Sequence, residues 1–140
     1  MQLANYSKIS IFFYKRIIEI IGIVTVLLSF FLLLSISTYT PDDPNFIFTQ
    51  NTKIQNLLGY YGSVTSDLIL QSFGIISFLF CVTIFFTGTL IIVHKKLENI
   101  LSNLFYSIIY IFAGSTFISI YKDHSFWLII NGNGGLLVVT

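Results

Sequence analysis

The side chains that could do chemistry are few in this sequence and lie far apart. Asp42 and Asp43 are adjacent carboxylates between two prolines, and a divalent-cation site would need further oxygen ligands clustered nearby. We therefore expect a solvated turn there. Cys81 is the single cysteine, which excludes an internal disulfide and a cysteine zinc site. No stretch has the form G-x-x-x-x-G-K-[ST] that cradles nucleotide phosphates. The sequence thus predicts no catalytic residue, metal or cofactor in this chain.

The remaining titratable groups favour structural roles. Asp67 stands just before a long apolar run, where an acid is stabilised by the dipole of a beginning helix, so we expect it to act as a helix cap. His94 adjoins Lys95 and is expected to be an interfacial anchor. The apolar runs carry no charge in their interiors, whereas transport paths through a membrane use embedded ionisable residues. This pattern argues against a transporter.

The composition identifies the class of protein. Of the 140 residues, 55% are hydrophobic and 9% are charged, whereas about 25% of residues are charged in a typical soluble domain. The mean hydropathy is +0.87. The formal net charge of +1 provides no basic field for nucleic acid. We expect an all-α integral membrane protein whose first partner is the lipid bilayer.

Three uncharged or nearly uncharged segments are long enough to cross a bilayer. They cover residues 17–38, 68–93 and 100–120, and the second is long enough that we expect it to tilt. The first could be a signal peptide, but its apolar run from Ile17 to Leu34 exceeds the usual hydrophobic region of such peptides. The prediction is a bundle of three complete spans with an irregular outer loop.

The distribution of basic residues predicts the orientation. Lys8, Lys15 and Arg16 precede the first span, and Lys95 and Lys96 follow the second. Basic residues mark the cytoplasmic side. We therefore expect a basic cytoplasmic N-terminus (1–16) and one membrane domain (17–140), with an outer loop (39–67), an inner hairpin (94–99), an outer Gly-rich segment (121–135) and the start of a fourth span (136–140).

Small residues recur at a spacing of four, which lets membrane helices approach closely. The pattern predicts helix contacts, with chance in a Ser- and Thr-containing apolar sequence as the alternative. The predicted contact residues are Gly62, Ser66, Thr83, Thr87, Ser115 and Ser119.

Two sequence motifs lie within the outer loop, one at each of its ends. The first runs Tyr39-Thr40-Pro41-Asp42-Asp43-Pro44-Asn45-Phe46, and the second runs from Asn56 through Gly59 and Gly62 to Asp67. In this order and spacing they resemble the N-terminal membrane domain of FtsK/SpoIIIE-type DNA translocases. The pair Gly134-Gly135 fits that family too, whereas Thr38 and Thr65 depart from its usual residues. The resemblance marks as site residues Tyr39, Pro41, Asp43, Pro44, Phe46, Asn56, Gly59, Gly62, Asp67, Gly134 and Gly135.

The resemblance implies a function beyond this chain. Family members have four spans, both ends in the cytoplasm, and a C-terminal hexameric ATPase that pumps duplex DNA through the closing septum. The membrane domain would anchor that motor in the bacterial inner membrane and contact division proteins. ATP, Mg²⁺, DNA and homo-oligomer formation would then belong to the motor, with no direct nucleic-acid contact here. We expect either that the gene continues beyond Thr140 or that the chain is a truncated or split product. The alternative is a small stand-alone membrane subunit that stabilises an unrelated complex.

Overall fold

The computed structural model describes residues 2–44, 53–97 and 100–121, and every regular element in these ranges is helical. The four α-helices and one short 3-10 helix are α1 (Gln2–Ser37), α2 (Gly59–Phe73), η1 (Gly74–Ile76), α3 (Ser77–His94) and α4 (Ile100–Tyr121). The predicted all-α class is therefore confirmed for these parts of the chain. The predicted Gly-rich segment beyond residue 121 and the start of a fourth span lie outside the described residues.

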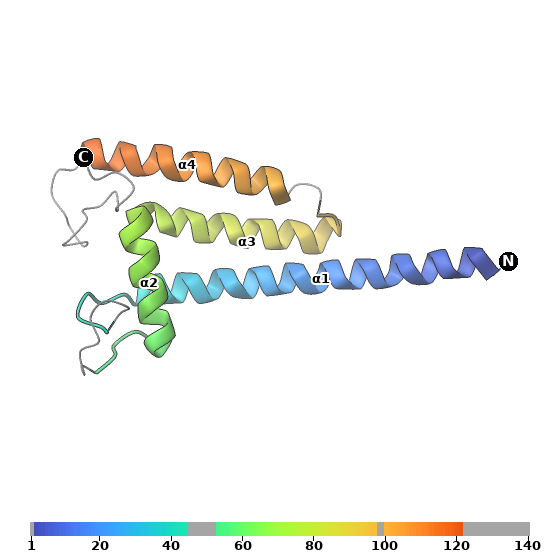
Figure 1. Ribbon diagram of the computed structural model, residues 1–140, viewed down its shortest axis with the longest axis horizontal. Coiled ribbons are helices and arrows are strands. Elements are labelled where there is room, and N and C mark those ends of the chain that lie inside the picture. Colours follow the sequence, from blue (N-terminus) through green and yellow to red (C-terminus); the bar gives the residue numbers. More distant parts are fainter. Residues whose placement is uncertain (1, 45–52, 98–99, 122–140) are drawn as a thin grey trace.

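Three helices run side by side and one crosses them. Helix α3 lies between α1 and α4, and the N-terminal part of α1 extends well beyond the other helices (Figure 1). Helix α2 crosses the far end of α1 at a steep angle. The most extensive packing is between α1 and α3, and α2 packs mainly on α1.

The hydrophobic core lies where the crossing helix meets the other two. Leu32 and Ile36 of α1, Leu70 of α2 and Cys81 of α3 are buried together. The other faces of the long helices carry large exposed apolar side chains, including Leu27, which is 62% exposed. Since soluble monomers rarely expose extensive apolar surface, these faces are suited to lipid.

Two described segments have the length and apolar composition of a membrane span, Ile9–Ser37 and Gly59–His94, and Ser102–Ile118 is a shorter apolar helix. The second segment is not one straight rod, because the helix breaks at Gly74. This residue has φ 64° and ψ −148°, a conformation that glycine adopts far more readily than other residues. The expected tilted span over 68–93 is therefore divided, with its first turns in α2 and the rest in α3.

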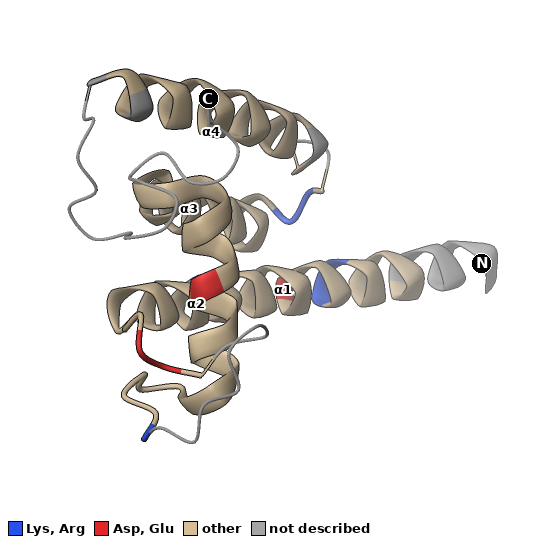
Figure 2. Ribbon diagram, turned by 60° about the vertical axis from the view of Figure 1, so that its left-hand side comes forward, with Lys and Arg blue, Asp and Glu red and all other residues tan. Residues whose placement is uncertain are grey.

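Charged residues are few on the described helices and are separated by long uncharged stretches (Figure 2). In the middle of α1, Glu19 forms ion pairs with Arg16 and with Lys95, which follows α3. Lys95 ends α3 in a left-handed conformation, with φ 53°. The pair between Glu19 and Lys95 ties the middle of α1 to the C-terminal end of α3.

Candidate functional site

The segment joining α1 to α2 contains most of the described motif residues, and we call it the connector (residues 38–44 and 53–58). It begins with a tight turn in which the Asp43 N–H donates to the Thr40 carbonyl at 3.2 Å. Pro41 is the second residue of this turn. Proline is favoured there because its ring fixes the φ angle that the turn requires. The Pro44 carbonyl then accepts a hydrogen bond from the Ser63 hydroxyl of α2 at 2.8 Å.

Asp43 is the anchor of the connector. Its carboxylate accepts hydrogen bonds from the backbone N–H groups of Gln55 at 2.8 Å and Asn56 at 2.9 Å. Asp43 is only 5% exposed, so the expectation of a solvated turn is wrong for this residue, although Asp42 is exposed. The chain returns at residues 55–56 and covers the carboxylate. The hydrogen bonds that this charged group accepts offset the free-energy cost of removing it from water.

Asn56 joins the end of α1 to the start of α2. Its side-chain amide donates to the carbonyls of Ser35 at 2.9 Å and Thr38 at 3.2 Å. These carbonyls belong to the end of α1, where backbone acceptors lack partners within the helix. Its side-chain oxygen accepts from the Leu58 N–H at 3.0 Å. One amide side chain thus bonds both to the end of α1 and to the residue that precedes α2.

The two motif glycines are required by this geometry. Gly59 begins α2 with φ +64°, in the left-handed region that favours glycine. A Cβ on Gly62 would lie 2.2 Å from Oδ1 of Asn56 and 2.6 Å from the Leu58 Cβ. The Gly62 carbonyl also accepts the Ser35 hydroxyl of α1 at 2.6 Å. Gly62 therefore permits the connector to pack closely on α2, while its carbonyl joins α2 to α1.

Asp67 takes a different role from the one expected. It lies in the middle of α2, whose first turn contains no acidic residue, so the prediction of a helix cap is wrong. The helix begins at Gly59, well before the apolar run. The Asp67 carboxylate instead accepts from the Tyr39 hydroxyl at 3.2 Å and from the Gln71 amide at 2.7 Å. Burial, together with the Asp67 carboxylate, raises the pKa of the Tyr39 phenol above its ordinary value.

The described motif residues therefore converge at one end of the molecule. Tyr39, Asp43, Asn56, Gly62 and Asp67 form or permit hydrogen bonds that join α1, the connector and α2. The remaining motif residues Phe46, Gly134 and Gly135 lie outside the described residues.

The outward face of this region is apolar and aromatic. Leu57 is 74% exposed and Tyr61 is 78% exposed, and Tyr60 and Leu68 are also exposed. Exposed aromatic side chains held on a hydrogen-bonded frame are suited to contact a protein or the interfacial layer of a membrane. In the parts of the chain that the structure describes, no group of three or more His, Cys, Asp or Glu residues could hold a metal.

The predicted small-residue positions have different environments. Gly62 and Ser66 are buried on α2, and Ser115 is buried on α4. The Thr83 hydroxyl of α3 and the Tyr110 hydroxyl of α4 form a hydrogen bond of 2.7 Å, while the Thr87 hydroxyl bonds to its own helix at the Thr83 carbonyl. The side chain of the last predicted position, Ser119, lies outside the described part of the chain.

One close helix contact, between α1 and α3, was not among the predicted positions. A Cβ on Gly22 of α1 would lie 3.1 Å from the Gly88 carbonyl, and a Cβ on Gly88 of α3 would lie 3.0 Å from the Val26 nitrogen. The Ser29 hydroxyl reinforces this packing by donating to the Cys81 carbonyl at 2.9 Å. The signal in the sequence was one glycine in each of two apolar segments, Gly22 and Gly88, with no small residue four positions away. A search for pairs spaced by four does not find them.

Comparison with known protein families gives a match to this chain. A family described as the 4TM region of DNA translocase FtsK/SpoIIIE matches residues 14–137. No curated protein and no solved structure matches the chain significantly. The matched range includes the apolar helices and the entire connector, and it covers most of the chain. The chain therefore belongs to the family of the 4TM region of the FtsK/SpoIIIE DNA translocases.

Proposed function

We propose that this chain is the membrane anchor that tethers a DNA translocase motor at the division septum of a bacterium. In this proposal the chain lies in the inner membrane with its N-terminus in the cytoplasm. ATP hydrolysis, DNA contact and homo-oligomer formation are assigned to the motor. The family membership and the apolar helices support the anchoring role.

The observation that carries the proposal is the frame that holds the connector against α2. A loop that served only to link two spans would not need a buried carboxylate and an amide that bonds to the end of α1 and to the residue before α2. Such a frame fixes the position of the exposed Leu57 and Tyr61. Rigid aromatic and apolar groups are common anchors of protein interfaces. We propose that this face contacts division proteins on the outer side of the membrane.

The test is the location of a fluorescent fusion of this chain in dividing cells. The fusion should gather at midcell, and Leu57→Ser should reduce the midcell fraction because it removes an exposed apolar contact. The matched control is Leu79→Ser, which removes an apolar side chain that is 50% exposed on α3 and is not part of the connector. Its midcell fraction should equal that of the unaltered chain.

Two results would contradict the proposal in different ways. An even distribution of the unaltered fusion around the membrane would refute recruitment to the septum. The midcell fraction of Leu57→Ser could also equal that of Leu79→Ser. If Tyr61→Ser gives the same result, this face is not the contact surface.

A further inference from the structure

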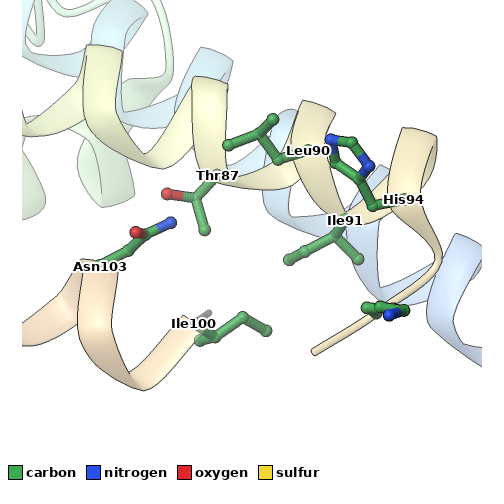
Figure 3. A pocket seen from close by; sticks show the side chains of 7 residues that line it. Thr87, Leu90, Ile91, His94, Ile100 and Asn103 are labelled. Carbon is green, nitrogen blue, oxygen red and sulfur yellow. The ribbon is translucent and has the colours of Figure 1, made fainter. Parts of the chain in front are cut away.

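A cavity opens between α3 and α4 at the end where the chain turns from one helix to the other. It has a volume of about 330 Å³, and its lining includes Thr87, Ile91, His94, Lys96, Ile100 and Asn103 (Figure 3). Volumes of about 300–1,000 Å³ are typical of ligand pockets. This cavity lies at the opposite end of α3 from the connector.

The mouth of the cavity is polar and basic. The hydroxyl of Thr87 and the amide of Asn103 point towards each other from facing helices (Figure 3). His94 and Lys96 are exposed at the same site. Among the residues that the structure describes, none of those lining the cavity is acidic, and Glu19 is ion-paired with Arg16 and Lys95. The mouth therefore presents donors and positive charge, which suit an anion.

An apolar groove continues from this mouth along the helices. It has a volume of about 310 Å³ and shares Thr87, Ile91, Ile100 and Asn103 with the first cavity. Beyond the shared residues its lining comes from three helices and includes Ile21, Phe80, Ile84 and Leu104. Because Phe80 lies near the start of α3 and His94 at its end, the groove leads from the basic end towards the middle of the helices.

We propose that the two adjoining cavities bind one anionic phospholipid. The phosphate of its headgroup would be held by Lys96, His94 and Asn103, and an acyl chain would lie in the groove beside Leu104. Basic pockets between membrane helices are suited to acidic headgroups, because each basic residue attracts the anionic lipid. A free phosphate would satisfy only the mouth and leave the apolar groove without a partner. The combination of a basic mouth and a continuous apolar groove therefore favours the lipid.

The test is native mass spectrometry of the purified chain in detergent, titrated with phosphatidylglycerol or with phosphatidylcholine. Phosphatidylglycerol should bind more tightly. Lys96→Gln should weaken its binding about fivefold, because one basic contact near the surface is removed. Phosphatidylcholine binding should change less. Lys53→Gln is the matched control, since it neutralises an exposed lysine at the connector, and it should leave both affinities unchanged.

The groove is tested separately with Leu104→Trp, which should weaken binding of both lipids by filling it. If this variant loses helix content, a photoreactive acyl chain on phosphatidylglycerol replaces it, and the label should appear on groove residues of α3 or α4.

Five outcomes would overturn the proposal. The first three are equal affinity for the two lipids, equal lipid affinity of the Lys96→Gln and Lys53→Gln variants, and photolabelling confined to helix faces outside the groove. The fourth is displacement of the lipid by excess inorganic phosphate, which would assign the mouth to a free anion. A lipid-free dimer that Leu104→Trp dissociates would assign the groove to a second copy of the chain and would also refute it.

Discussion

Asn56 and Gly62 should behave as one energetic unit. The Asn56 side chain forms three hydrogen bonds, to the Ser35 and Thr38 carbonyls and from the Leu58 N–H. At about 1 kcal/mol for each bond, Asn56→Ala should lower the free energy of unfolding by about 3 kcal/mol. Part of this loss reflects buried carbonyls that are left without a partner.

Gly62→Ala should cost a similar amount by a different route. Its new Cβ would lie 2.2 Å from the Asn56 side-chain oxygen, so Asn56 must leave its position and lose the same hydrogen bonds. If the two changes were independent, the double variant would lose about 6 kcal/mol. We expect a loss of about 3–4 kcal/mol, because the clash with Oδ1 disappears once Asn56 is alanine. The remaining contact of 2.6 Å with Leu58 accounts for the upper part of that range.

The assay is unfolding by SDS titration in mixed micelles, followed by far-UV circular dichroism. Thr65→Ala is the control on the same helix. The exposed Thr65 hydroxyl donates a hydrogen bond to the Tyr61 carbonyl of its own helix, so its removal leaves the connector intact. Its effect should stay within about 0.5 kcal/mol. Additive losses in the double variant, or a Gly62→Ala variant as stable as the control, would refute this account of the connector.

Three further predictions concern other parts of the chain. Gly88→Ala should lower the free energy of unfolding by about 1–3 kcal/mol in the same titration, because its Cβ would approach the backbone of α1. Gly114→Ala should lower it less, since the nearest atoms to its Cβ belong to the side chain of an isoleucine. A larger loss for Gly114→Ala than for Gly88→Ala would contradict the close packing of α1 on α3. Ultraviolet titration should show phenol ionisation above the ordinary pKa of about 10 that decreases in Tyr39→Phe, because burial and the Asp67 carboxylate raise the pKa of Tyr39. Since folding raises this pKa, its contribution to stability should be complete below about pH 10 and disappear as pH rises through the folded-state pKa. An unchanged titration curve in Tyr39→Phe would oppose this. A reporter active only in the cytoplasm should work when fused after Lys96 and fail after Asn51, and the opposite pattern would reverse the orientation.

Several features followed from residue types alone. The low charge and long apolar runs are sufficient to predict helices and a membrane environment, because a lipid-exposed backbone must satisfy its hydrogen bonds within the helix. The connector motifs were recognisable because Pro, Asp, Asn and Gly have strong local preferences in turns. Residues 100–120 were likewise expected to form a helix, and α4 covers Ile100–Tyr121.

Other features depended on contacts between segments distant in sequence. Asp43 looked solvent-exposed because its environment is provided by residues 55–56, and Asp67 looked like a cap because α2 begins earlier than the apolar run. The break at Gly74 was also not predicted, since glycine is compatible with both a continuous and a broken helix. Sequence patterns reveal local preference and burial tendency, but they do not identify the partner of a buried group.

The amino-acid sequence by itself thus determined the membrane class, the helical content and the residues of the two loop motifs, since each depends on composition or local chain geometry. Only the tertiary structure decided what those motif residues do. It placed Asn56 between two helix ends and Gly62 beneath its side chain. It also brought Gly22 against Gly88. These relations depend on how α2 crosses α1 and how α1 packs on α3, and such angles arise from packing the whole chain together.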